Sequence, residues 1–198
     1  MRRALDPAAA ARARDYLVLL EKWNRVYNLT AIRDSSQWVS HHLLDCLAVV
    51  PHLPAGALVD VGSGAGLPGI PIALANPMRP VTLLESNQKK CAFLRQVVGQ
   101  LGLANVTTVP SRVEAYRPTA LFDGVISRAF SDLPEFLASA GHLCAPGGRL
   151  LAMKGVYPDE ELSQLPAGVV ERVLRLEVPG LRAERHLVTI DPLRRLGN

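Results

Sequence analysis

The sequence predicts an α/β fold, a doubly wound and mostly parallel seven-stranded sheet with an antiparallel edge. Apolar, strand-like segments alternate with helix-like segments from residue 57 to residue 153. A glycine-rich turn joins the first of these strands to the first of these helices. Residues 169–178 and 185–190 read as a closing hairpin around the turn Pro179-Gly180. We expect residues 1–55 to form a small helical extension and residues 56–198 to form the main domain.

The extension begins with a helix start signal, because Asp6 can cap the helix and Pro7 suits its first position. One apolar stripe, expected to pack on the main domain, is formed by Tyr16, Leu20, Trp23 and Tyr27. Asn28-Leu29-Thr30 ends this helix, and a second helix is predicted from about residue 37 to residue 46, capped by residues 34–36. His41 and His42 diverge by about 100° on a helix, so we expect one packed and one exposed, without a shared metal.

The main domain reads as an ordered series of strands and helices. The predicted strands are 57–61, 81–85, 106–109, 123–127 and 149–153, before the hairpin. The predicted helices are 67–75 with Pro68 in its first turn, 88–101, 132–143 and the short 158–165, and residues 146–148 read as a turn. This order gives the doubly wound arrangement.

The glycine turn indicates a nucleoside ligand. Residues 58–69 read LVDVGSGAGLPG, with glycines at 62, 64 and 66. Glycines allow a tight turn and let a ligand approach the backbone closely. The pattern is G-x-G-x-G, with Leu67 where a dinucleotide fingerprint has its third glycine, which suits a ligand without a pyrophosphate, such as S-adenosylmethionine. The alternative is a tight turn that binds nothing.

Glu85 is the second half of this signal. It ends the predicted strand 81–85, and a carboxylate at that place can accept the two ribose hydroxyls of a nucleoside. The alternative is an exposed acid at a strand end. Because the two features stand at the spacing of one βαβ unit, together they favour the binding site.

Composition excludes several classes of protein. The chain has 198 residues, 48% of them hydrophobic, and no apolar run approaches the ~20 residues of a membrane span. The first residues are charged and lack the apolar core of a signal peptide. Its three cysteines are far apart and fit neither a disulfide framework nor metal spacing. We expect buried thiols in a cytoplasmic protein that has no metal and no membrane contact.

The net charge of +4 lies at the two ends of the chain. Residues 1–45 and 171–198 each carry an excess of two basic side chains, whereas residues 46–170 are balanced. This distribution favours a polyanionic partner held by the flanks. Candidate phosphate contacts, or simply a solvated face, are Arg2, Arg3, Arg12 and Arg14.

The chain resembles the RsmG (GidB) family. The motifs that carry the resemblance are the glycine turn, Glu85, residues 23–32 (WNRVYNLTAI), 42–45 (HLLD), 111–114 (SRVE), 126–130 (ISRAF), 153–155 (MKG) and 185–188 (RHLV). Cys46 stands where the family commonly has serine after HLLD, a swap that we expect to be tolerated. The tail from Asp191 to Asn198 is less like the family, and its role is open.

The resemblance implies a Rossmann-like class I methyltransferase that uses S-adenosylmethionine to methylate N7 of a guanine in 16S ribosomal RNA. It implies cofactor contacts at Gly62, Leu67, Val113, Glu114 and Arg128. The expected partner is 16S ribosomal RNA or the small ribosomal subunit, and we expect a monomer. The alternatives are a methyltransferase for another RNA base or a small molecule, and a non-catalytic RNA-binding module.

Guanine N7 carries a lone pair and no proton, so its methylation requires no general base, and the sequence shows no base–nucleophile pair. We assign no catalytic residue. The Asn/Asp-Pro-Pro-aromatic turn typical of amine methylation is replaced here by residues 127–130, and Cys144 follows a predicted helix and reads as core rather than as a nucleophile.

Each further site residue has a possible role and a structural alternative. Gly64 belongs to the cofactor turn, Glu114 would meet the adenine amino edge with Val113 on the ring, and Arg128 follows the fourth strand at its carboxyl end. The substrate candidates are Asn28, Arg33, His42 and Lys154, each as plausible in a purely structural role.

Overall fold

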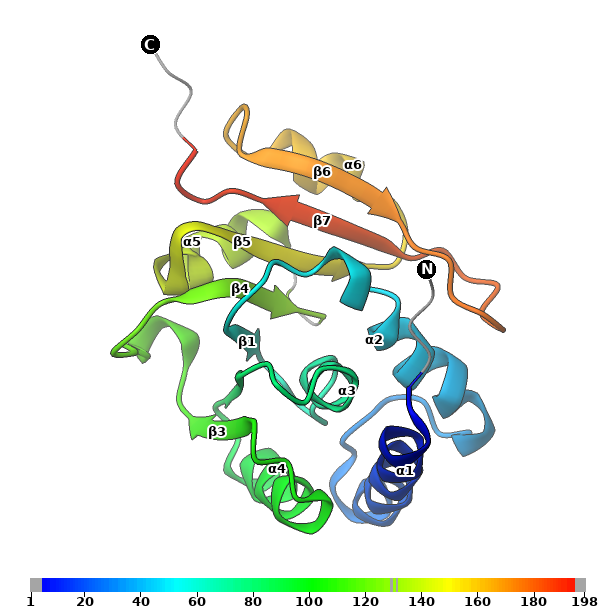
Figure 1. Ribbon diagram of the computed structural model, residues 1–198. Helices are drawn as coiled ribbons and strands as arrows, with labels where there is room; N and C mark the ends of the chain where they lie inside the picture. The colour runs from blue at the N-terminus through cyan, green and yellow to red at the C-terminus, as the bar shows by residue number, and fades with distance from the viewer. Residues whose placement is uncertain (1–4, 129, 131, 195–198) are drawn as a thin grey trace.

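Seven strands form one mixed sheet in the computed structural model, which describes residues 5–128, 130 and 132–194 (Figure 1). Their order is β3-β2-β1-β4-β5-β7-β6. The strands are β1 Leu58–Val61, β2 Val81–Glu85, β3 Val106–Pro110, β4 Phe122–Ser127, β5 Cys144–Lys154, β6 Val170–Arg175 and β7 His186–Ile190. The first five pair in parallel, and β7 runs antiparallel to β5 and β6. The predicted doubly wound sheet with an antiparallel edge is confirmed.

Two of the long helices begin and end at the predicted capping residues. The α-helices are α1 Pro7–Tyr27, α2 Asp45–Leu47, α3 Gly69–Ala75, α4 Gln88–Leu101, α5 Leu133–Ala140 and α6 Asp159–Ser163. Asp6 accepts a hydrogen bond from the backbone N–H of Ala9, and Asn28 ends α1 with a left-handed backbone. The side chain of Asn87 accepts hydrogen bonds from the backbone N–H groups of Lys89 and Lys90 at the start of α4. Local capping chemistry therefore sets these helix boundaries.

The two faces of the sheet bury separate hydrophobic clusters, because successive strand residues point to opposite faces. Leu58 belongs to the cluster under α1, α3 and α4, whereas Val59 belongs to the cluster under α5. Tyr16 and Leu20 of α1 are fully buried in the first cluster, as predicted, and α1 packs against α3 and α4 (Figure 1). The extension thus shares its core with the sheet, and the domain boundary at residue 56 stays a prediction.

One local prediction was right only in outline, and two were wrong. The predicted second helix of the extension is present, but its form is irregular, with a 3-10 turn at Ser35–Gln37 and a π-helix at Val39–Leu44 ahead of α2. Helix α3 starts at Gly69, whose N–H donates to the buried carboxylate of Asp60, so Pro68 lies before the helix. Residues 146–148, predicted as a turn, belong to β5, where the pairing with β4 is irregular.

Cys46, Cys91 and Cys144 are free and buried, as expected. No helix of the described residues combines the length and the apolar composition needed to cross a membrane. Arg2, Arg3 and the end of the tail, 195–198, lie outside the described residues, as do 129 and 131.

Candidate functional site

The glycine turn after β1 folds over the end of β2. Its three glycines have positive φ values, +68° at Gly62, +56° at Gly64 and +84° at Gly66, which other residues rarely adopt. The backbone N–H groups of Gly62 and Ser63 both donate to the carbonyl of Leu84, over 2.9 and 3.1 Å. The turn therefore lies where the parallel strands end, which is the edge at which α/β folds bind ligands.

Glu85 is buried and holds this turn in place. One carboxylate oxygen accepts from the N–H of Gly64 at 2.8 Å, and the other accepts from the N–H of Asn87 at 2.8 Å. The two features that the sequence singled out are thus in direct contact. A carboxylate has about four acceptor positions, so Glu85 keeps capacity for two hydroxyl groups beyond these backbone bonds.

Asp60, also buried, anchors the other side of the turn. Its Oδ2 accepts from the N–H of Gly69 at 2.8 Å, and the Ser63 hydroxyl donates to its backbone carbonyl. Its Oδ1 has no hydrogen-bond partner among the described residues. Burial raises the pKa of Asp60 to about 7, which lets the carboxyl avoid the cost of an unpaired buried charge.

Two cavities share Gly62 in their lining. The smaller one, about 150 Å3, is lined by Glu85, Val113, Glu114 and Phe130 among others. The larger one, about 500 Å3, is lined by Gly64, Leu67 and Arg128 among others. A Cβ atom at Gly62 would find nothing within 4 Å, so this glycine faces open space. Every predicted cofactor residue therefore lines one of these two cavities.

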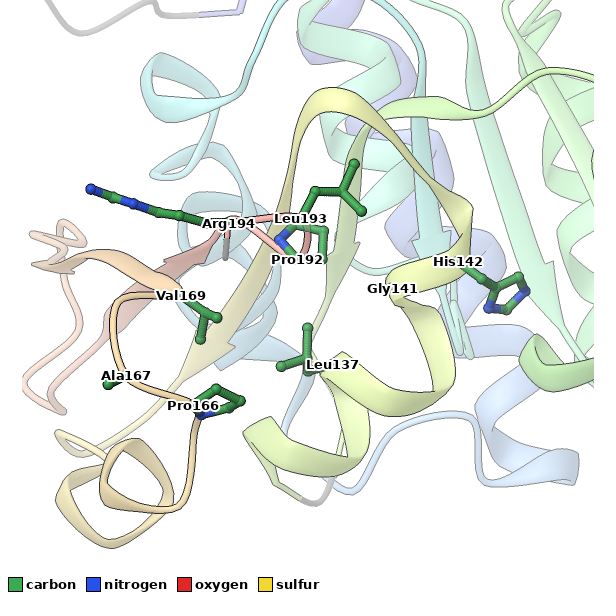
Figure 2. Close-up of a pocket in the computed structure, with 9 residues that line it drawn as sticks. All are labelled: Leu137, Gly141, His142, Pro166, Ala167, Val169, Pro192, Leu193 and Arg194. Atoms are coloured by element: carbon green, nitrogen blue, oxygen red, sulfur yellow. The ribbon is translucent and has the colours of Figure 1, made fainter. Parts of the chain in front are cut away.

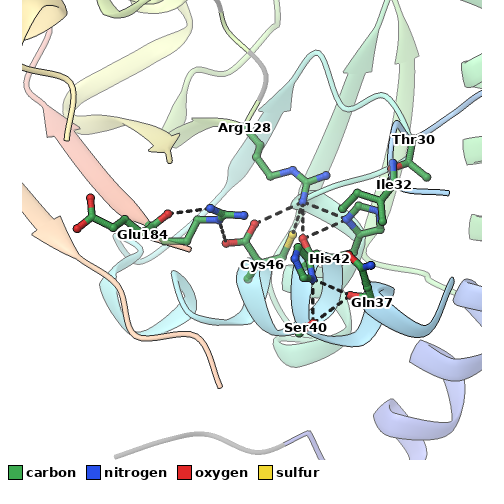
Figure 3. Close-up of polar contacts among 11 residues, drawn as sticks. Thr30, Ile32, Gln37, Ser40, His42, Cys46, Arg128 and Glu184 are labelled. Atoms are coloured by element: carbon green, nitrogen blue, oxygen red, sulfur yellow. Dashed lines mark hydrogen bonds and ion pairs between the residues drawn. The ribbon is translucent and has the colours of Figure 1, made fainter. Parts of the chain in front are cut away.

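Arg128 reaches from the end of β4 to the segment Val39–Leu44 and the residues after it (Figure 3). Its Nη1 lies 3.3 Å from the carbonyl oxygen of His41, 3.5 Å from Oδ2 of Asp45 and 4.0 Å from the sulfur of Cys46. Arg128 therefore joins the extension to the sheet inside the larger cavity.

Asp45 is the acidic centre of this network. Its carboxylate is buried, with Oδ1 3.0 Å from Nε of Arg185 and Oδ2 3.5 Å from Nη1 of Arg128. Burial raises the pKa of Asp45, while the two arginines act in the opposite direction. One carboxylate thus links α2, the end of β4 and the residue before β7.

His42 is the packed member of the histidine pair, and His41 is half-buried. Its Nε2 lies 2.9 Å from the hydroxyl of Thr30. Burial and the nearby Arg128 lower the pKa of His42 to about 4. Its Nδ1 lies 3.1 Å from the carbonyl oxygen of His41, so both ring nitrogens have partners, and the ring that borders the larger cavity is neutral at pH 7.

The other substrate candidates lie differently. Lys154 lines the larger cavity and forms an ion pair with Glu161 at 2.7 Å. Arg33 and Asn28 lie outside the cavity lining, where Nη1 of Arg33 donates to the Asn28 side chain at 2.7 Å. Their neighbours from Leu29 to Ile32 line the cavity instead. These two exposed side chains therefore sit beside the mouth of the site.

Sequence reasoning assigned no role to several residues that line the larger cavity. These are Thr30, Asp45, Lys90 and Arg185. Arg185 could have been found, because it precedes an antiparallel strand, which starts at the edge where the parallel strands end. For Asp45 the only local signal is its place three residues after His42.

A third cavity, about 590 Å3, lies at the opposite edge of the sheet (Figure 2). It is lined by α5, the loop before β6 and the residues that follow β7, such as Leu137, Val169 and Leu193. Its lining is mostly apolar and contains none of the predicted site residues. Among the described residues, no group of three or more His, Cys, Asp or Glu side chains is placed to hold a metal ion.

A family model and individual relatives of this chain carry the same description. The model of the GidB family, described as rRNA small subunit methyltransferase G, matches residues 9–188. A protein from Aromatoleum aromaticum named ribosomal RNA small subunit methyltransferase G is 57% identical over 193 residues, covering 94% of this chain and 92% of its own. A protein of the same name from Chromobacterium violaceum is 59% identical over 175 residues, covering 87% of this chain and 84% of its own.

Solved structures share the fold at low sequence identity. A SAM-dependent methyltransferase from Aquifex aeolicus has a TM-score of 0.59 at 19% identity, covering 78% of this chain and 93% of its own. A Burkholderia thailandensis N1-methyltransferase solved with S-adenosylhomocysteine has a TM-score of 0.59 at 16% identity, covering 89% of this chain and 88% of its own. These likenesses confirm the predicted class I methyltransferase fold.

Proposed function

The chain belongs to the GidB family, rRNA small subunit methyltransferase G, and we propose that it transfers the methyl group of S-adenosylmethionine to N7 of a guanine in 16S ribosomal RNA. The observation that carries this proposal is the pair of neighbouring cavities that share Gly62 in their lining. A two-part site suits a reaction in which a nucleoside cofactor and a nucleobase must meet.

The residues of the smaller cavity fit the adenosine part of the cofactor. Glu85 would accept the ribose hydroxyls, and Glu114 would accept from the adenine amino group. Val113 and Phe130 offer apolar surface to the adenine ring. Gly62 has no side chain to fill the space between the cavities, through which the cofactor would pass.

The larger cavity would hold the methionine part and the target guanine. Gly64 and Leu67 form its wall on the cofactor side, and Arg128, His42 and Lys154 form its wall on the substrate side. Arg128 can donate hydrogen bonds to a carboxylate or to guanine O6, because a guanidinium carries five donors. The ion pairs of Asp45 with Arg128 and Arg185 fix the position of this donor.

The bound cofactor supplies an electrophilic methyl group. No residue of the chain has to remove a proton, because guanine N7 has none. The side chains of the cavity contribute by orienting N7 in line with the methyl carbon, and orientation of this kind lowers barriers by ~7–11 kcal/mol. The neutral His42 borders this cavity without placing a charge beside the base, while its two ring nitrogens stay bonded to Thr30 and His41.

Basic side chains near the mouth would meet the RNA backbone. Lys90, Lys154 and Arg185 line the cavity, and Arg33 lies outside it. Phosphate contacts of this kind give RNA affinity a strong dependence on salt. We propose that the protein acts in the cytoplasm as a monomer, on 16S RNA or on the small ribosomal subunit.

The test is a methyl-transfer assay with purified protein, radiolabelled S-adenosylmethionine and small subunits from cells that lack the corresponding gene. We expect label in 7-methylguanosine after nuclease digestion of the 16S RNA. Label in another nucleoside would instead support a different RNA methyltransferase, and transfer to free nucleosides would support a small-molecule enzyme. Retention of RNA with no transfer would support a binding module.

A further inference from the structure

Two aromatic side chains of this protein are exposed. All its tyrosine, tryptophan and phenylalanine residues lie in the described part of the chain, and only Tyr27 and Tyr157 are more than a third exposed, at 42% and 46%. An exposed aromatic ring beside basic groups is a common element of single-stranded RNA recognition.

The two rings differ in what covers them. The ring of Tyr27 lies 5.2 Å from that of Trp23, and Nζ of Lys89 lies 5.7 Å over it. Tyr157 makes one ring contact among the described residues, an edge-on contact with His186 at 5.5 Å and 85°. Edge-on packing of this kind leaves a face of the Tyr157 ring open to a planar ligand.

The ring partner of Tyr157, His186, is itself buried and hydrogen-bonded. His186 is buried at the start of β7, and its Nδ1 lies 2.8 Å from the carbonyl oxygen of Gly155. Gly155 lines the larger cavity, two residues before Tyr157. Tyr157 does not itself line that cavity, but it follows the lining residues closely in the chain and packs edge-on against a buried histidine.

Two basic residues lie close to Tyr157 and His186 in the chain. Lys154 and Arg185 both line the larger cavity, and they adjoin the segment 155–157 and His186 in sequence. Lys154 is paired with Glu161 and Arg185 with Asp45, so phosphates on either side of a base on the Tyr157 ring would bind these two groups in competition with the carboxylates. Val156, 73% exposed, adds apolar surface beside it.

The proposed reaction needs such a surface, and this inference rests on that function. Guanine N7 faces the major groove, which in an RNA helix is too deep and narrow for side chains to reach. The target must therefore be presented in an unpaired, unstacked strand, at a cost in stacking free energy. Aromatic side chains that stack on bases recover part of that cost.

We propose that Tyr157 is a stacking residue for the RNA substrate, binding an unpaired base of the strand that enters the larger cavity. The contact is between ring faces and needs no hydrogen bond from the phenol. Tyr157 therefore contributes to the binding and presentation of RNA, while the cofactor is held by other residues.

The experiment compares Tyr157→Leu, Tyr157→Phe and the control Met78→Ala with the wild type. Met78 is 92% exposed and precedes β2, at the edge of the sheet opposite the site. Three measurements are made on each protein. They are the affinity of the S-adenosylhomocysteine-loaded protein for small subunits from cells that lack the gene, the KM and kcat of methyl transfer to these subunits, and the affinity for S-adenosylhomocysteine by calorimetry.

We expect Tyr157→Leu to weaken subunit binding and raise KM about tenfold, with kcat within about twofold and unchanged affinity for S-adenosylhomocysteine. Tyr157→Phe and Met78→Ala should match the wild type. Equal binding by Tyr157→Leu and wild type would overturn the inference, as would a phenylalanine variant as weak as the leucine variant, or a loss of cofactor affinity. Absence of transfer by the wild type would contradict the proposed function, and the binding arm would still decide the role of Tyr157.

Discussion

Glu85 accepts a hydrogen bond from the backbone N–H of Gly64, with 2.8 Å between the two heavy atoms. This bond ties the tip of β2 to the turn that follows β1, and it makes the shape of the cofactor turn depend on one buried carboxylate. The residue proposed to bind ribose therefore also stabilises the glycine turn. Its substitution should affect both the stability of the fold and the affinity for the cofactor.

We predict that Glu85→Ala destabilises the protein and abolishes most of its affinity for the cofactor. Loss of the carboxylate leaves the buried N–H groups of Gly64 and Asn87 unpaired, at about 1–3 kcal/mol for each. Glu85→Gln keeps one acceptor oxygen, so it should be more stable than Glu85→Ala and should still bind the cofactor weakly. Denaturant unfolding and calorimetry with S-adenosylhomocysteine measure the two effects, and unchanged binding by Glu85→Ala would remove Glu85 from the site.

A matched pair of glycines separates strain from function. Gly62 and Gly102 have similar φ values, +68° and +60°, and a Cβ atom at either position meets nothing within 4 Å. Substitution by alanine should cost each position about 1 kcal/mol of stability, from the left-handed backbone. Only Gly62→Ala should lower cofactor affinity, because its methyl group enters the space between the two cavities. Equal affinities in the two variants would contradict the proposed path of the cofactor.

Asp45→Asn tests the ion-pair network. The substitution removes the charge between Arg128 and Arg185, whose side chains are 25% and 23% exposed. Because solvent partly screens both arginines, we expect a loss of about 1–3 kcal/mol in stability rather than the larger cost of a fully buried pair. Methyl transfer should fall at least about tenfold, since Arg128 loses its anchor. Asp15→Asn, on the exposed face of α1, is the control, and a similar small effect of both variants on transfer would contradict this role.

Asp60 predicts a particular pH dependence of stability. Its pKa in the folded protein is raised to about 7 by burial, above the ordinary value of 3.8 in the unfolded chain. Between these two values the folded state holds a proton that the unfolded state has released. Wild-type stability should therefore fall relative to Asp60→Asn as pH rises from 5 to 7, by at most about 1.4 kcal/mol per pH unit, and then level off. A constant difference between the two proteins over pH 5–8 would show that Asp60 titrates normally.

Local sequence patterns predicted the fold and the cofactor side of the site. Glycine spacing, capping residues and alternating apolar strands are short-range signals, and Glu85 and Gly64 belong to one βαβ unit, only 21 residues apart. Their meeting follows from the regular geometry of that unit. The sequence predicted a helix before α2 but not its π-helical form, because a π-helix and an α-helix have similar apolar patterns over six residues.

The substrate side of the site could not be derived in the same way. Asp45 and Arg185 are separated by 140 residues, and no local periodicity connects them. Their pairing depends on how the extension packs on the sheet and on the antiparallel direction of β7. The pKa of His42 likewise depends on burial and on Arg128, which lies 86 residues away.

Equilibrium dialysis of the purified wild-type protein against S-adenosylmethionine and S-adenosylhomocysteine tests the central claim most directly, because every role proposed above depends on a cofactor held at the glycine turn. We predict saturable uptake of one molecule per chain, competition between the two compounds, and loss of uptake in Gly62→Ala but not in Gly102→Ala. No uptake of either compound by the folded wild-type protein would contradict the account.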